Sequence, residues 1–127
     1  MQPQPLIAVR DVEASSHWYQ RLLGCKSGHG GTEYERLVEG DRLLLQLHDW
    51  DADEHPYIGD PRTKPYGNGV LLWFQIEDFD AAVARARAMS AEVLEGPLVN
   101  RNANHREIWL RDPDGYVVVL ASAYGEV

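Results

Sequence analysis

The chain has 127 residues, 44% of them hydrophobic, which suffices for one well-packed core but not for two ordinary domains. Its 12 basic and 20 acidic residues give a formal net charge of −8, which disfavours nucleic acids as partners and would favour a cationic small molecule. The single cysteine and the lack of an apolar run near the roughly 20 residues of a membrane helix predict a cytoplasmic protein with neither a disulfide nor a membrane partner.

The first elements read as a strand followed by a helix. Residues 6–9 form a short apolar run, and Asp11 comes next as a helix N-cap. From Val12 to Leu23, apolar side chains recur at three- and four-residue spacing, which predicts an amphipathic helix. Gly24 then supplies the residue that a helix C-cap favours, so we expect the helix to end there.

Three further strands complete the first half. A weak strand is expected near residues 25–28, and residues 33–38 and 42–48 predict two stronger strands. Gly40 lies at the centre of the turn between the last two. The first half therefore reads β-α-β-β-β.

The second half repeats this order. Residues 70–76 predict a strand, Asp78 a helix cap, and the apolar stripe from Phe79 to Met89 a helix. Strands follow at residues 92–94, 106–111 and 116–122, and an Asp-Pro-Asp-Gly turn at residues 112–115 joins the last two. A shift of 67 positions places Ile7 on Phe74, Val9 on Ile76, Asp11 on Asp78, Val12 on Phe79, Ala14 on Ala81 and Leu22 on Met89.

A long connection separates the halves. We divide the single domain, residues 1–127, into module one at residues 4–50, a linker loop at residues 51–69 and module two at residues 70–122. The linker is rich in proline, glycine and aspartate, which disfavours a helix or a central strand. Its aromatic residues argue against plain disorder, because such side chains normally find a surface to cover.

Two segments carry a family resemblance. Residues 6–24, with their strand, aspartate cap and helix ending in Leu-Leu-Gly, resemble the opening of the vicinal-oxygen-chelate superfamily, the glyoxalase, bleomycin-resistance and extradiol-dioxygenase group. Residues 106–116, Arg-Glu-Ile-Trp-Leu-Arg-Asp-Pro-Asp-Gly-Tyr, resemble its terminal hairpin. The resemblance implies an α+β fold in which two βαβββ modules form a curled mixed sheet around a cavity, with the helices on the outer face.

Strand alternation then predicts which side chains face that cavity, because neighbouring residues of a strand point to opposite sides. Indole and phenol rings would form walls and a lid, and polar side chains would orient the ligand. The residues expected to contact a ligand are Gln46, His48, Trp50, Tyr57, Tyr66, Leu71, Trp73, His105, Arg106, Trp109 and Val119.

The resemblance implies that a metal ion, where a relative uses one, is bound by one His, Glu or Gln side chain from each of four strands. In this chain the four positions fall on Gln4, Gln46 (or Leu45, if the register differs by one residue), Leu71 and Val119. Two hydrocarbon side chains cannot bind a divalent cation, and neutral amides are poor ligands. We therefore expect no cofactor. The alternative is one divalent metal ion at a relocated site, for which the candidate donors are Gln4, His17, Gln46, His48, His55, His105 and Glu107.

These observations favour a metal-free protein that binds a small planar or cationic molecule, such as an antibiotic, in its cavity. One alternative is a metal-dependent lyase of the glyoxalase kind or an extradiol-type dioxygenase with relocated ligands. A second is a metal-free enzyme with Glu107, His48 or His105 as general base. The resemblance also implies a homodimer.

Overall fold

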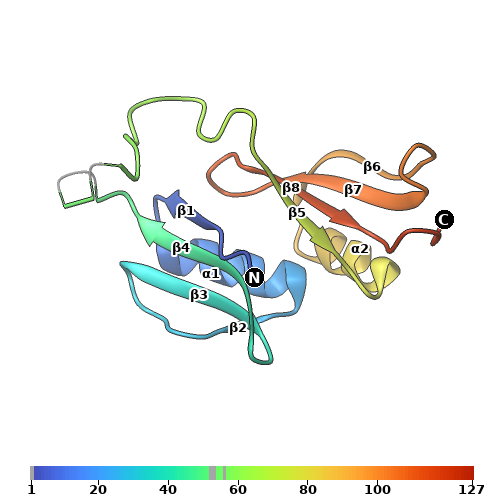
Figure 1. Ribbon diagram of the computed structural model, residues 1–127, viewed down its shortest axis with the longest axis horizontal. Coiled ribbons are helices and arrows are strands. Elements are labelled where there is room, and N and C mark those ends of the chain that lie inside the picture. The colour runs from blue at the N-terminus through green and yellow to red at the C-terminus, as the bar shows by residue number, and fades with distance from the viewer. Residues whose placement is uncertain (1, 52–53, 56) are drawn as a thin grey trace. The chain divides into compact units, whose positions relative to one another are not determined.

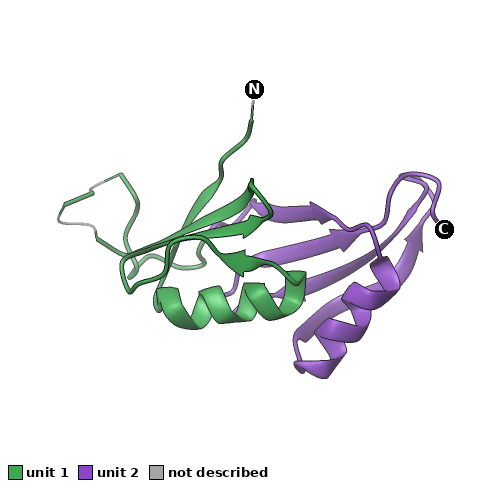
Figure 2. Ribbon diagram, turned by 90° about the horizontal axis from the view of Figure 1, so that it is seen from below, with its two compact units in different colours: residues 1–66 green, residues 67–127 purple. Residues whose placement is uncertain are grey.

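The computed structural model describes residues 2–51, 54–55 and 57–127 (Figure 1). The chain forms two compact units, Met1–Tyr66 and Gly67–Val127 (Figure 2). Their boundary falls inside the segment that the sequence marks as a linker. Among the described residues, neither helix has the length and apolarity required to cross a membrane.

Unit 1 contains β1 (Leu6–Val9), α1 (Val12–Leu23), β2 (Lys26–Ser27), β3 (Tyr34–Glu39) and β4 (Arg42–Asp49). Its four strands form one sheet in the order β1-β4-β3-β2. The β1 strand runs parallel to β4, and the other neighbours are antiparallel.

Unit 2 contains β5 (Leu71–Gln75), α2 (Phe79–Ala88), β6 (Glu92–Asn100), β7 (His105–Arg111) and β8 (Val117–Ala121). The sheet order is β5-β8-β7-β6, again with one parallel pair, β5 and β8. In each unit the helix covers one face of the sheet (Figure 2). The prediction of two βαβββ modules with mixed sheets and outer helices is confirmed.

The internal repeat extends to atomic detail. The Asp11 carboxylate accepts from the backbone N–H of Ala14 at 3.0 Å, and Asp78 accepts from Ala81 at the same distance. The parallel strand pairs also share a register, since Leu6 is opposite Gln46 in unit 1 and Trp73 is opposite Val119 in unit 2. Trp73 lies 67 positions after Leu6, and Val119 lies 73 positions after Gln46, because the second half is longer between its first and last strands. The two halves are therefore the same structural unit built twice.

Each helix covers one sheet face, and this decides the burial of alternate strand residues. In β4, Leu43, Leu45 and Leu47 are buried, whereas the intervening side chains are only half-buried. In β5, Leu72 is buried, whereas Leu71 and Trp73 are 46% and 44% exposed. The face away from the helix is thus partly open in both units.

The β6 strand is longer than predicted, covering residues 92–100 instead of 92–94. Gly96 and Pro97 obscure it in the sequence, because both residues normally interrupt strands. In the structure β6 is an edge strand, and its register against β7 shifts on both sides of Glu95. An edge position and bulges accommodate these residues without ending the strand.

Glu35 links β2 and β3 of unit 1 to helix α1 by hydrogen bonds. This β3 carboxylate is 3% exposed and accepts from the hydroxyls of Ser16 in α1 and Ser27 in β2, at 2.8 and 2.7 Å. It also accepts from the backbone N–H groups of His29, Gly30 and Arg36. Burial alone would raise the pKa of Glu35, but these hydrogen bonds outweigh it and lower the pKa to about 2.

We predict that Glu35→Gln lowers the free energy of unfolding by about 3 kcal/mol at pH 7, because the amide gives up the charge and places a donor among donors. The folded pKa lies below the unfolded value of 4.5. The stabilisation is therefore complete above about pH 4.5 and is lost as the pH falls toward about 2. Urea unfolding at pH 7 and at pH 3 measures this, with the exposed Glu33→Gln as the matched control. Equal losses at both pH values, or equal losses in the two variants, would contradict it.

Candidate ligand-binding site

The sheet face of unit 2 that α2 leaves uncovered carries two indole rings. Trp73 in β5, Val119 in β8 and Trp109 in β7 are direct neighbours across three strands, so their side chains share a face. The two indole centroids lie 6.2 Å apart at an interplanar angle of 86°, an edge-to-face contact. The His105 ring lies 5.7 Å from Trp73.

A buried carboxylate lies on the same face. Glu107 occupies β7 between His105 and Trp109, at two-residue spacing, and is 4% exposed. It accepts from His105 Nε2 at 2.7 Å and from Trp109 Nε1 at 3.0 Å. The Asn100 side-chain amide lies 3.3 and 3.4 Å from its two oxygens. Because a carboxylate can only accept, His105 must hold its proton on Nε2 in this pair.

These contacts keep Glu107 charged. Burial would raise the pKa of the Glu107 carboxyl, but the hydrogen bonds from His105, Trp109 and Asn100 outweigh it and hold the pKa below its usual value. The Trp109 indole is thus held by a negative charge, and no Lys or Arg of the described residues is among the hydrogen-bond donors to that charge.

The predicted polar residues of unit 1 lie on the corresponding face of its own sheet. Gln46 accepts from the Tyr34 hydroxyl at 2.5 Å and donates to the backbone oxygen of Gln4 at 2.9 Å. His48 makes edge contacts with the rings of Tyr34 and His55, at centroid distances of 6.3 and 5.0 Å.

Two of the three aromatic residues predicted as a lid are packed against each other, and the third is exposed to solvent. Trp50 and Tyr66 pack together with ring centroids 5.1 Å apart, and the Tyr66 hydroxyl donates to the Pro61 carbonyl. Tyr57 is fully exposed. Trp50 and Tyr66 therefore stabilise their own loop within unit 1, and the structure does not bring Tyr57 to them.

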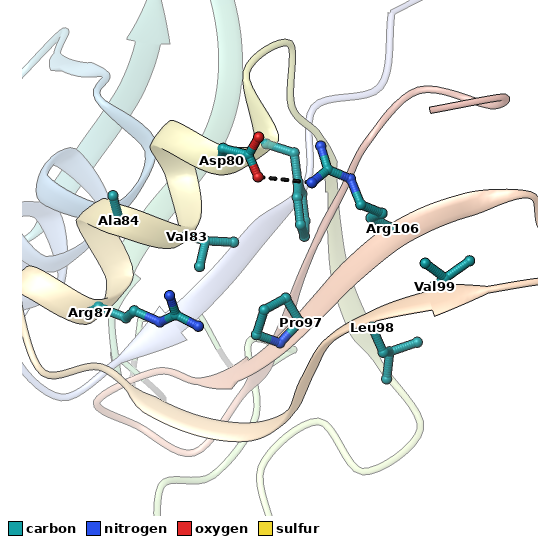
Figure 3. A pocket seen from close by; sticks show the side chains of 9 residues that line it. Asp80, Val83, Ala84, Arg87, Pro97, Leu98, Val99 and Arg106 are labelled. Carbon is teal, nitrogen blue, oxygen red and sulfur yellow. Dashed lines mark hydrogen bonds and ion pairs between the residues drawn. The ribbon is translucent and has the colours of Figure 1, made fainter. Parts of the chain in front are cut away.

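Arg106 lies apart from the other predicted residues of unit 2. Strand alternation points it to the α2 face, away from His105 and Glu107, together with the buried Ile108. There its guanidinium donates to Asp80 at 2.8 Å and lies 4.8 Å from the centroid of Phe79 (Figure 3). Arg106 is therefore not part of the indole face, because residues 105 and 106 cannot share a face of a regular strand.

The side chains at the family's metal positions do not fit a divalent cation. Both polar atoms of the Gln46 amide already have protein partners. Leu71 and Val119 are neighbours of the indole face but offer no donor atom, and Val119 is fully buried. Gln4 is exposed and precedes β1. Two amides and two hydrocarbons lack the carboxylate or imidazole that such an ion requires.

The side chains expected as donors for a relocated ion form separate small groups within each unit. In unit 2, His105 and Glu107 are bonded to each other. In unit 1, the ligand atoms of Asp51, Glu54 and His55 lie within 4.8 Å of one another on a loop. His17 is exposed on α1. A small group of exposed acidic loop residues is common in proteins that bind no metal, so it defines no site.

Sequence reasoning missed Asn100 and considered Glu107 only as a metal donor or a general base. Asn100 was missed because the predicted strand ended at residue 94, six residues before the true end of β6. The signal for Glu107 was present in the two-residue spacing of His105, Glu107 and Trp109, which places an acid on a face with an indole.

Comparison with known proteins agrees with this architecture. The sequence profile of the Glyoxalase/Bleomycin resistance protein/Dioxygenase superfamily matches residues 2–120. The chain belongs to this superfamily. No curated protein matches it significantly.

Solved structures share the fold at low sequence identity. A glyoxalase/bleomycin resistance protein/dioxygenase family enzyme from Burkholderia phytofirmans PsJN has a TM-score of 0.75 and 21% identity, over 94% of this chain and 95% of that one. A glyoxalase/bleomycin resistance protein/dioxygenase from Nocardioides has a TM-score of 0.74 and 20% identity, over 98% and 83%. The fosfomycin resistance protein FosX from Listeria monocytogenes has a TM-score of 0.69 and 14% identity, over 97% and 93%.

We predict that Gly96→Ala loosens this face. Gly96 has φ 89°, and a Cβ there would lie 2.8 Å from the backbone oxygen of Glu107, so β6 would have to move away from β7. The expected loss in unfolding free energy is about 3 kcal/mol. The matched control is Gly125→Ala, with φ 92° and open space around its Cβ, for which about 1 kcal/mol is expected. Urea unfolding measures both, and equal losses would rule out close packing at Gly96.

Proposed function

We propose that the protein binds a planar, cationic small molecule on the Trp73–Trp109 face of unit 2, without a metal ion. The observation that carries the proposal is the buried carboxylate of Glu107, which accepts a hydrogen bond from Trp109, the indole that makes the edge contact with Trp73. An indole face attracts cations through its quadrupole, and a nearby fixed negative charge adds to that attraction.

The geometry supports stacking on Trp73 in particular. Its side chain is 44% exposed, although it belongs to a strand whose neighbour Leu72 is buried. Trp109 and His105 contact it from the side and limit its rotation. A flat ligand on such a pre-oriented ring gains about 0.5–1.5 kcal/mol beyond the burial of area, and a cation gains about as much again.

Superfamily membership supports a small-molecule ligand without identifying it. The metal-dependent lyase or dioxygenase alternative has less support, because the side chains at the four family positions do not fit a cation. The net charge of −8 favours a cationic ligand through the long-range field. Homodimerisation and a cytoplasmic location remain parts of this proposal, and light scattering checks the first.

Two probes of the same shape test the proposal: 1-methylquinolinium and its neutral isostere 1-methylnaphthalene. We expect the cation to bind about tenfold more tightly, because it alone interacts with the Glu107 charge and the indole quadrupoles. Trp73→Leu should weaken both probes about fivefold, and Glu107→Gln should reduce the preference for the cation to the part that the indoles supply, while the neutral probe binds as before. Titration calorimetry measures the affinities.

Trp18→Phe, on helix α1 of unit 1, serves as the matched control and should bind both probes like the unaltered protein. An undiminished preference for the cation in Glu107→Gln would rule out the carboxylate as its source. Equal weakening in Trp18→Phe and Trp73→Leu would place the ligand elsewhere.

Metal removal separates this proposal from the lyase or dioxygenase alternative. We predict that the purified protein contains far less than one equivalent of divalent metal, and that dialysis against EDTA leaves the affinity for 1-methylquinolinium unchanged, since no step of binding needs an ion. Metal analysis by mass spectrometry checks the first point. Stoichiometric metal, or affinity lost on dialysis and restored by Mn²⁺ or Zn²⁺, would reverse the ranking.

A further inference from the structure

The α2 face of unit 2 has a hollow of its own, on the other side of the sheet from the indoles. Its volume is about 430 Å³, within the usual range for small-molecule sites. Figure 3 shows Val83 of α2 and Pro97 of β6 in the middle, with Arg87 and Arg106 on either side.

The hollow exists because one ten-residue helix faces a four-stranded sheet. Phe79 and Val83 of α2 are buried, but the bulged edge strand β6 is left largely uncovered, and Val99 is 45% exposed. An apolar floor therefore remains open to solvent between helix and edge strand. Val83, Ala84, Pro97 and Val99 supply it.

The two guanidinium groups give the hollow its charge. Arg106 donates to Asp80 through one nitrogen, but its buried Nε–H has no acceptor among the described residues. Arg87 makes no ion pair with any described residue. The lining of the hollow thus contains two guanidinium groups and one carboxylate, Asp80, which is 81% exposed. The local balance is positive in a chain whose net charge is −8.

We propose that this hollow binds a small carboxylate with an apolar tail. Guanidinium groups pair with carboxylates by charge-assisted, often bidentate hydrogen bonds, and the floor between the two arginines accepts hydrocarbon. The acid group lies toward Arg87 and Arg106, and the tail covers Val83 and Pro97. This site is independent of the one proposed on the indole face.

The test uses octanoate with the full chain, with 1-octanol as neutral isostere and acetate as the acid without a tail. We expect saturable octanoate binding by calorimetry, at least about tenfold tighter than for either comparison compound. Amide NMR shifts should be largest at Val83, Ala84 and Val99. Arg87→Gln should weaken octanoate about tenfold, whereas Asp80→Asn, which releases Arg106, should strengthen it several-fold.

Arg101→Gln is the matched control, because it removes the same charge from an exposed position outside the hollow. It should bind octanoate normally, as should Trp73→Leu and Glu107→Gln, whose altered residues belong to the other site. The proposal is overturned if Arg87→Gln and Arg101→Gln bind equally, if 1-octanol matches octanoate, or if Asp80→Asn weakens binding.

Discussion

The constraint behind both sites is that each four-stranded sheet has a single helix to cover it. Side chains of a strand alternate between two faces, so the residues turned toward the helix become core and their neighbours are left at a partly open surface. This explains why Leu72 is buried while Leu71 and Trp73 beside it are nearly half exposed. Polar and aromatic groups that would be costly in a closed core can therefore occupy the open face.

Two buried glutamates show how the surroundings of a carboxylate decide its role. Glu35 faces its helix and is fully occupied by two hydroxyls and three backbone N–H groups, so it serves to hold loop, sheet and helix together. Glu107 lies on the open face, and its donors are side chains that could themselves contact a ligand. A buried carboxylate thus stabilises the fold in unit 1, where it is Glu35, and orients aromatic rings in unit 2, where it is Glu107.

The repeat made most of the fold predictable. Paired aspartate caps and period-two apolar runs encode local structure directly, and both modules were found from them. The end of β6 was not predicted, because Gly96 and Pro97 disfavour a strand in the local sequence. Only the pairing of β6 with β7 keeps these two residues within the strand. The aromatic part of the site followed from strand parity, whereas Asn100 depended on that hidden extension. Arg106 was expected to contact a ligand, and the alternation of residues 105 to 109 separates it from Glu107 and places it on the α2 face.

Strand β7 lies between the two proposed binding sites and contributes residues to both. Its odd-numbered residues His105, Glu107 and Trp109 present a carboxylate and aromatic rings on one face, and Arg106 presents a guanidinium on the other. The strand lies in the interior of the sheet, between β6 and β8, and Ile108 and Leu110 fill the helix side beyond Arg106. Opposite charges on adjacent residues would neutralise each other on a flexible chain. On this strand they point in opposite directions and each takes its own partners, so one strand can favour a cation on one face and an anion on the other.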